Sequence, residues 1–210
     1  MKKIMFSEKF CLEEAVLKGY KTQTRRVATY RMLSLAMSGF FTEGAEKGQC
    51  CLCDNYKVVA KSAYKVGEVI AIAQRYESLL DKEWSKEDRN VVCGKILDAH
   101  RKERLAEVAG YRNKQFVCAS LMPHHIKITH IRAEKLQKIS EKDARSEGVR
   151  TNELAMDRCC VDWPLYSFWN QEEFYANRTE AFREASKELM GQHIWNSNPW
   201  VFVYEFELVD

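Results

Sequence analysis

The residues with the clearest chemical potential lie in one short segment, Gly19 to Arg26, which reads Gly-Tyr-Lys-Thr-Gln-Thr-Arg-Arg. A glycine lets a helix end abruptly, and we expect Lys21 and Thr24 to point into one concavity beyond it. Burial lowers the pKa of a lysine, and a neutral lysine beside a hydroxyl can accept its proton and create a nucleophile. Arg26 adds a fixed positive charge. From spacing alone, the same cluster also fits a solvated basic turn.

The elements that must position this segment can be predicted from periodicity and from capping residues. A helix with Ser7 as its N-cap is expected to run as far as Lys18 and to stop at Gly19. A capping box at Ser140 and Asp143 opens a second helix that ends at Gly148. Strands are predicted over residues 3–6, 69–74, 116–121, 126–136 and 200–208, and a further helix over residues 171–190.

Two segments interrupt this pattern and are interpreted as insertions. Residues 28–55 contain a stretch, Tyr30 to Phe41, that is apolar enough for a helix, followed by a cluster of cysteines. Residues 76–112 are charged and helical in pattern. About five strands with helices between them predict an α+β fold built on a small mixed β-barrel.

Four motifs, in this order along the chain, resemble the phage-type branch of the ASCH domain family. Gly19, Lys21 and Arg26 match the signature Gly-x-Lys-x-x-Glu-x-Arg, with Thr24 where many members have Glu. The other three motifs are the segments 64–68, 134–149 and 195–206. The resemblance implies a single ASCH domain over residues 1–210, with a PUA-like barrel whose pocket recognises a nucleoside or an RNA base.

Within that family, the Lys-x-x-Thr pair is similar to the bacterial N4-acetylcytidine amidohydrolases. Carried over by motif, the resemblance implies Lys21 as general base, Thr24 as nucleophile and Glu147 as proton donor, acting on N4-acylated cytidine. The alternatives are a non-catalytic RNA-binding module and a ribonuclease. One departure is that phage-type relatives carry an Arg-Glu pair at the end of the strand 69–74, where this chain keeps only Gln74 as a polar residue.

Five residues are predicted to contact the substrate. Arg26 can hold a carbonyl oxyanion or a phosphate, with Arg25 beside it and Gln74 at the end of its strand. Trp195 and Trp200 flank a turn at residues 196–199 that can rim a pocket, and base stacking on such rings is a common recognition device. Packing of the C-terminal aromatic residues in the core is the alternative.

Composition bounds the remaining possibilities. The formal net charge is +3, and 46% of residues are hydrophobic, values typical of an ordinary globular protein. No stretch reaches the roughly 20 apolar residues needed to span a bilayer, so we expect no membrane partner and a cytoplasmic location with reduced cysteines. No cofactor is predicted. Cys50 and Cys53 have the spacing of half a zinc site, and reduced thiols without a metal are the favoured interpretation.

Overall fold

The computed structural model describes residues 1–28, 33–35, 49–51, 58–80, 86–159, 161, 163–171 and 173–209. The chain divides into two compact units. Unit 1 comprises Met1–Phe6, Val69–Ile126 and Val209–Asp210, and unit 2 comprises Ser7–Glu68 and Lys127–Leu208. Every residue of the predicted site except Gln74 belongs to unit 2.

The main sheet has five strands in the order β1-β6-β7-β10-β2. Their bounds are β1 Lys3–Ile4, β6 Val69–Ile72, β7 His125–Lys135, β10 Trp200–Leu208 and β2 Gln23–Val27. Strands β1 and β6 are parallel, whereas β10 and β2 are antiparallel, so the sheet is mixed. The predicted α+β class is confirmed. Within the described residues, β1 and β2 are the two end strands of an open sheet, and the PUA-like closed barrel stays a prediction.

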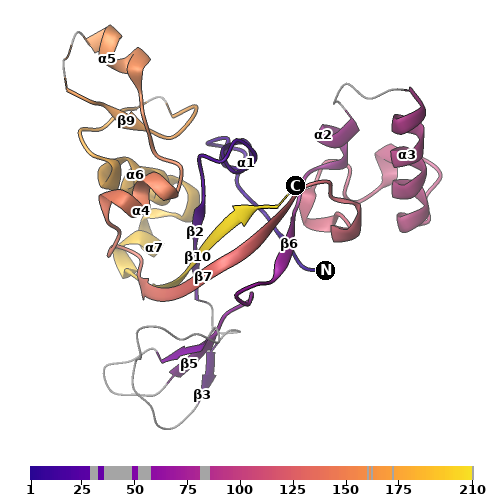
Figure 1. Ribbon diagram of the computed structural model, residues 1–210, viewed down its shortest axis with the longest axis horizontal. Coiled ribbons are helices and arrows are strands. Elements are labelled where there is room, and N and C mark those ends of the chain that lie inside the picture. Colours follow the sequence, from indigo (N-terminus) through magenta and orange to yellow (C-terminus); the bar gives the residue numbers. More distant parts are fainter. Residues whose placement is uncertain are drawn as a thin grey trace. The chain divides into compact units, whose positions relative to one another are not determined.

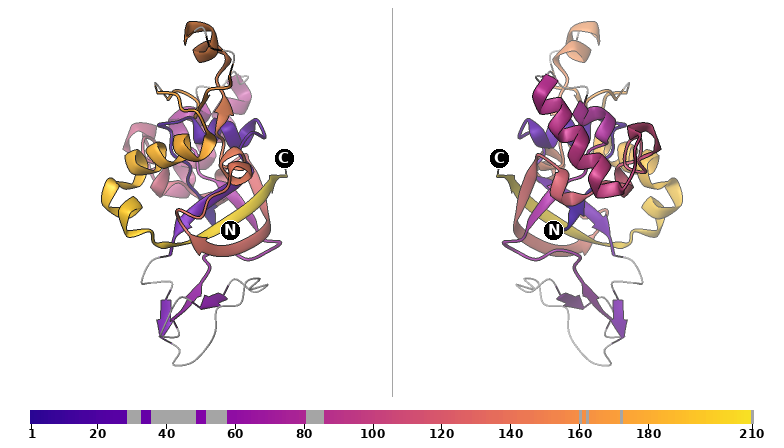
Figure 2. Two further views of the ribbon diagram at one scale, coloured as in Figure 1. Left: turned by 90° about the vertical axis from the view of Figure 1, so that its left-hand side faces the viewer. Right: turned by 90° about the vertical axis from the view of Figure 1, so that its right-hand side faces the viewer.

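Unit 1 packs its strands with a helical segment. The helices α2, Tyr76–Leu80, and α3, Lys86–His100, lie side by side (Figure 2) and fall inside the predicted insertion at residues 76–112. Three 3₁₀ turns follow, η2 Leu105–Glu107, η3 Lys114–Phe116 and η4 Ala119–Leu121. The core of this unit consists of Ala71, Ala73, Tyr76, Leu79, Ile96, Val108, Val117 and Met122.

The strand predicted over residues 116–121 is wrong, because this segment folds into the turns η3 and η4. The side chain of Asn113 accepts a hydrogen bond from the Gln115 backbone N–H and so caps the first turn. Local capping of this kind competes with strand pairing. Val117 is buried while Phe116 is 52% exposed, so of this apolar pair only Val117 packs into the core.

The first helix of unit 2 begins later than the sequence suggested. Helix α1 spans Leu12–Leu17, and its N-cap is Cys11 in a left-handed conformation, so the prediction of Ser7 as N-cap is wrong. The Ser7 carbonyl accepts a hydrogen bond from Leu12 N–H at 3.1 Å and closes a turn before the helix. Gly19 follows the helix with φ +73°, as predicted for a helix stop, and leads the chain toward β2.

The segment at residues 28–55 lies mostly outside the described residues. Its described parts are the strands β3, Leu33–Leu35, and β4, Gln49–Cys51, which both pair antiparallel with β5, Val58–Lys61. The helix predicted over residues 30–41 is therefore wrong at 33–35. The β-branched pair Val58-Val59 in β5 favours an extended partner there.

The rest of unit 2 places helices beside β2 and β10 (Figure 1). These are α4 Glu141–Ser146, α6 Arg178–Met190 and α7 Gln192–Ser197, and the short elements β8 Arg150–Thr151, α5 Glu153–Cys159 and β9 Tyr166–Ser167 complete the unit. The capping box at Ser140 and Asp143 is confirmed. Helix α6 starts at Arg178 instead of Gln171, because the Asn177 side chain caps it.

Aromatic rings form the centre of unit 2. Phe168 stacks with Phe10 at a centroid distance of 5.7 Å, and Phe182 of α6 lies 6.5 Å from Phe168 and 6.4 Å from Trp195. Helix α6 buries Ala181, Phe182, Ala185 and Ser186, the spacing of one helical face. No helix in the described ranges is long and apolar enough to cross a membrane.

Candidate functional site

Lys21 and Glu147, 126 residues apart in sequence, are in direct contact. The Lys21 ammonium donates to Glu147 Oε2 at 2.6 Å and to the Glu147 backbone carbonyl at 2.8 Å, and both residues are 3% exposed. Glu147 is the C-cap of α4, and a backbone hydrogen bond from Thr22 N–H to the Ser146 carbonyl ties the end of that helix to the start of β2. The termination of α4 therefore sets this ion pair.

Burial dominates the electrostatics of Lys21. Loss of solvent lowers the pKa of its ammonium below the usual value, and the Glu147 carboxylate opposes that shift. Arg26 and Arg25 add to the lowering. The balance makes Lys21 easier to deprotonate than a surface lysine, which is the property required of a general base.

Arg25 lies on the other side of Glu147 and is held by carboxylates. Its guanidinium is 3.0 Å from Glu147 Oε1, 2.6 Å from Glu134 Oε1 and 3.4 Å from Asp143 Oδ2. Only 2% of its side chain is exposed. This guanidinium orients the Glu147 carboxylate through its terminal nitrogens, and its contact with a substrate stays a prediction.

The charge network extends to Arg132, which sequence reasoning did not identify. Arg132 pairs with Asp143 at 2.7 Å and Glu134 at 3.5 Å, and also pairs with Glu205 of β10. A signal was present in the sequence, because Arg132 and Glu134 are spaced by two on a strand and so share a face. The partner carboxylates on other elements carried no such signal.

Thr24 and Arg26 face away from Arg25. Thr24 pairs with Tyr204 across the antiparallel ladder, and Arg26 pairs with Phe202, so alternation puts both on the opposite side of β2 from Arg25. Thr24 is 5% exposed, and within the described residues its hydroxyl makes no hydrogen bond. Burial lowers the pKa of Arg26, against the raising influence of Tyr64 and Glu147. Arg26 thus acts electrostatically on the Lys21–Glu147 pair from the Thr24 side.

The other predicted contact residues are Gln74, Trp195 and Trp200, and each contacts neighbouring side chains. Gln74 belongs to unit 1, where it is 3% exposed and its backbone N–H donates to Met122 Sδ at 3.2 Å. Trp195 is 8% exposed and packs edge-on against Phe182, so it is part of the core, and its contact with a substrate stays a prediction. Trp200 lies under the Lys135 ammonium, 5.0 Å from the ring centroid.

One cavity, of about 520 Å³, adjoins the charge network. Gln23, Arg132, Asp143 and Glu205 contribute to its lining. The side-chain oxygen Oε1 of Gln23 accepts a hydrogen bond from the Arg132 guanidinium at 3.3 Å, while the buried Nε2 of the same side chain has no hydrogen-bond partner among the described residues. This cavity lies on the Arg25 side of β2, because Gln23 and Arg25 share a face.

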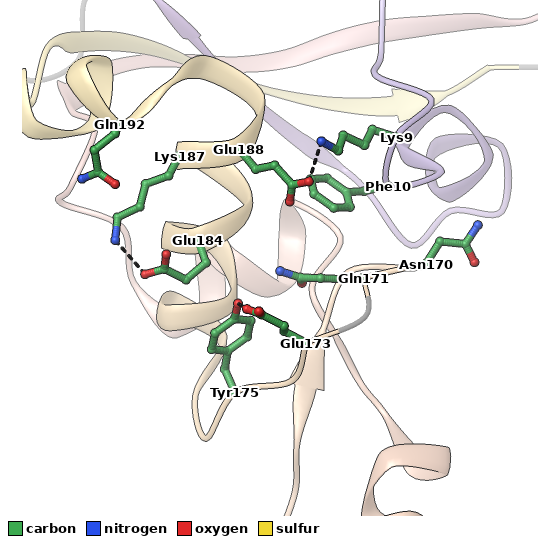
Figure 3. A pocket seen from close by; sticks show the side chains of 10 residues that line it. All are labelled: Lys9, Phe10, Asn170, Gln171, Glu173, Tyr175, Glu184, Lys187, Glu188 and Gln192. Atoms are coloured by element: carbon green, nitrogen blue, oxygen red, sulfur yellow. Dashed lines mark hydrogen bonds and ion pairs between the residues drawn. The ribbon is translucent and has the colours of Figure 1, made fainter.

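A second cavity, of about 670 Å³, lies beside α6 (Figure 3). Its charged groups pair with one another: Lys9 is 2.5 Å from Glu188, and Lys187 is 2.8 Å from Glu184. Burial and a hydrogen bond to a neighbouring glutamate raise the pKa of Tyr175, which stays a neutral phenol. None of the predicted site residues contributes to its lining.

The predicted zinc ligands are only partly described. Cys53 lies outside the described residues, and Cys50 is described only as part of the backbone of β4. Free thiols are found at Cys11, Cys93, Cys118 and Cys159. Across the described part of the chain, no group of three or more His, Cys, Asp or Glu side chains is arranged to hold a metal ion.

The chain was compared with protein-family models, curated proteins and solved structures. No family model matches the chain, and no curated protein or solved structure matches it.

Proposed function

We propose that the protein is an ASCH-type hydrolase with a PUA-like barrel, and that it removes an acyl group from the exocyclic amine of a cytidine-like nucleoside. The observation that carries the proposal is the buried contact of Lys21 Nζ with Glu147 Oε2 at 2.6 Å. It joins the first and third of the four motifs on which the family resemblance rests. The two residues to which the resemblance gives base and acid roles are thereby within proton-transfer distance.

The proposed chemistry starts from a proton shared within this pair. Transfer from Lys21 to Glu147 leaves a neutral amine and a protonated carboxyl group. Arg25 opposes that transfer, because it stabilises the carboxylate, but Glu134 and Asp143 offset its charge.

The Lys21 amine then accepts the hydroxyl proton of Thr24 as the oxygen attacks the acyl carbon. An ester forms on Thr24, the C–N bond breaks, and Glu147 gives its proton to the departing cytidine amine. Arg26 stabilises the oxyanion. Water hydrolyses the ester, which releases the carboxylic acid and restores the threonine.

The experiment is incubation of the purified protein with N4-acetylcytidine, followed by chromatographic detection of cytidine. Thr24→Val keeps the shape but removes the nucleophile, and Lys21→Arg keeps a charge that does not deprotonate in proteins. Each change should lower kcat by roughly 10²–10⁴-fold, the usual contribution of such groups. Lys127→Arg, at an exposed position of β7, is the matched control for Lys21→Arg.

Both site variants must retain a wild-type Tm for the comparison to hold. Turnover by Thr24→Val at the wild-type rate would exclude the covalent route. Cleavage of RNA by the wild-type protein without cytidine release would favour the ribonuclease alternative, and RNA binding without either reaction would favour the binding module.

A further inference from the structure

Cations and aromatic rings alternate on a surface of unit 2, formed by Lys18, Tyr20, Arg150 and Trp169; we call it the stacked patch. The Arg150 guanidinium lies 3.9 Å from the centroid of the Tyr20 ring and 5.0 Å from that of Trp169. The Lys18 ammonium is also 5.0 Å from the Trp169 ring. Three separate segments converge here, after α1, at β8 and after β9.

The rings of the stacked patch remain accessible. Tyr20 is 43% exposed and Trp169 is 42% exposed, although each already contacts a cation. The Arg150 guanidinium contacts both rings, so they form one contiguous surface and are not exposed aromatic residues scattered singly. The Lys18 ammonium is also paired with Glu14 at 2.6 Å, a surface contact that a ligand can displace at little cost.

A pocket of about 480 Å³ adjoins the stacked patch and shares Arg150 and Trp169 with it. The volume falls in the range of small-molecule sites, roughly 300–1,000 Å³. Asn152, Asn170 and Gln171 line it, and each amide makes a hydrogen bond within the protein, to Ser167 Oγ, to Cys11 Sγ and from Phe168 N–H respectively. An amide carries two donor hydrogens and an acceptor oxygen, so such groups can read a base edge in addition. A ring face, a guanidinium plane and amides in one hollow suit a nucleotide.

The pocket lies next to the Lys21–Glu147 pair. A Cβ atom built on Gly148 would lie 3.6 Å from Lys21 Cβ and 3.7 Å from Phe168 Cε1, and Phe168 lines the pocket. Gly148 therefore lies between Lys21 Cβ and the Phe168 ring.

We propose that the stacked patch and its pocket bind a nucleotide next to the target base, so that the cytidine-like nucleoside is recognised within a single-stranded polynucleotide. Single strands are recognised by stacking of unpaired bases on aromatic and arginine planes, with basic side chains on the phosphates. The catalytic consequence rests on the proposed function, whereas the binding surface does not.

Binding can be measured by fluorescence anisotropy with a labelled cytidine-rich RNA of about ten nucleotides, its DNA equivalent and an RNA duplex. Base–aromatic stacking is worth about 1–3 kcal/mol per base, so Trp169→Ala should raise Kd for the single strand by roughly 5–150-fold. Trp163→Ala, which removes a tryptophan that is 60% exposed outside the patch, is the matched control. Arg150→Met should lower the salt dependence of Kd by about 0.7 in log–log slope if one phosphate is contacted.

Tighter binding of RNA than of DNA would identify the strand as RNA, and the reverse would identify DNA. Equal binding of duplex and single strand would overturn the proposal, because paired bases cannot stack on the patch. Wild-type affinity in a Trp169→Ala protein with unchanged Tm would overturn it as well.

The two proposals fail separately. Oligonucleotide binding that depends on Trp169, without release of cytidine from any acylated substrate, would remove the hydrolase function and leave the binding surface. Turnover of free N4-acetylcytidine without oligonucleotide binding would remove the surface and leave the hydrolase.

Discussion

Replacement of Glu147 by glutamine tests the energetics of the buried pair directly. Glu147→Gln keeps the side-chain shape but leaves Lys21 and Arg25 without their shared counter-charge, in a place where only 2% of each side chain is exposed. Removal of one partner from a buried ion pair costs about 3–5 kcal/mol. Since the amide retains one acceptor oxygen, we expect the lower end, about 3 kcal/mol, which corresponds to a Tm lower by roughly 6–12 °C for a chain of this size.

Urea unfolding followed by tryptophan fluorescence measures this loss. Glu207→Gln is the matched control, because Glu207 lies 3.7 Å from Lys127 with both side chains about half exposed, and such surface pairs contribute about 0–1 kcal/mol. If Glu147→Gln and Glu207→Gln lower the free energy of unfolding equally, the buried pair contributes no more to stability than a surface pair.

A double-mutant cycle with Lys21→Met separates the pair from its surroundings. The double variant Lys21→Met, Glu147→Gln should lose about 0.5–3 kcal/mol less free energy of unfolding than the sum of the two single losses. Each single variant leaves one buried charge without its partner, whereas the double variant removes both charges. Additive effects would mean that the contact at 2.6 Å carries no coupling energy.

The pH dependence of the same variants has a defined sign. Burial lowers the pKa of Lys21 in the folded protein below the 10.5 of the unfolded chain. Between the folded and the unfolded pKa the unfolded chain binds more protons, so the free energy of unfolding rises with pH in that range. Glu147→Gln removes the influence that raises the pKa of Lys21, and the rise should begin at lower pH. Urea unfolding at pH 7 and pH 9 checks this, and Lys21→Met should abolish the difference.

Three further changes have clear expectations. Ser140→Ala removes the capping box of α4 and should cost about 1 kcal/mol in urea unfolding. Asp143→Asn should reduce the decrease in the free energy of unfolding at acidic pH. Burial opposes ionisation of Asp143, but the Ser140 hydrogen bond and the charges of Arg132 and Arg25 lower its pKa below 3.8. The stabilising contribution of this carboxylate is therefore present above pH 3.8 and is lost as the pH falls through the lower folded pKa. Gly148→Ala forces a side chain into φ +108°, which should cost about 1–3 kcal/mol and, because Glu147 precedes it, should also reduce turnover.

Local patterns in the sequence were sufficient for elements whose own residues carry the signal. Strand β10 occupies the predicted range, although its four consecutive residues Val201 to Tyr204 are all buried, so both faces of the strand are covered there. The capping box at Ser140 and the stops at Gly19 and Gly148 depend on side chains or φ angles within a few residues. Lys21 and Glu147 could be named as partners because the family resemblance linked their motifs.

Contacts between segments distant in sequence decided the features that a short stretch of residues does not encode. The apolar run at residues 116–121 became turns because the Asn113 cap outcompeted strand pairing. Three carboxylates from β7 and the α4 region neutralise Arg25, and their approach depends on how α4 packs against β2. Thr24 and Arg26 were separated from Arg25 by the alternation of β2, a consequence of its ladder with β10. Residue types and their spacing determined which groups can do chemistry; long-range packing determined which of them meet, because burial and charge compensation arise only when distant segments come together.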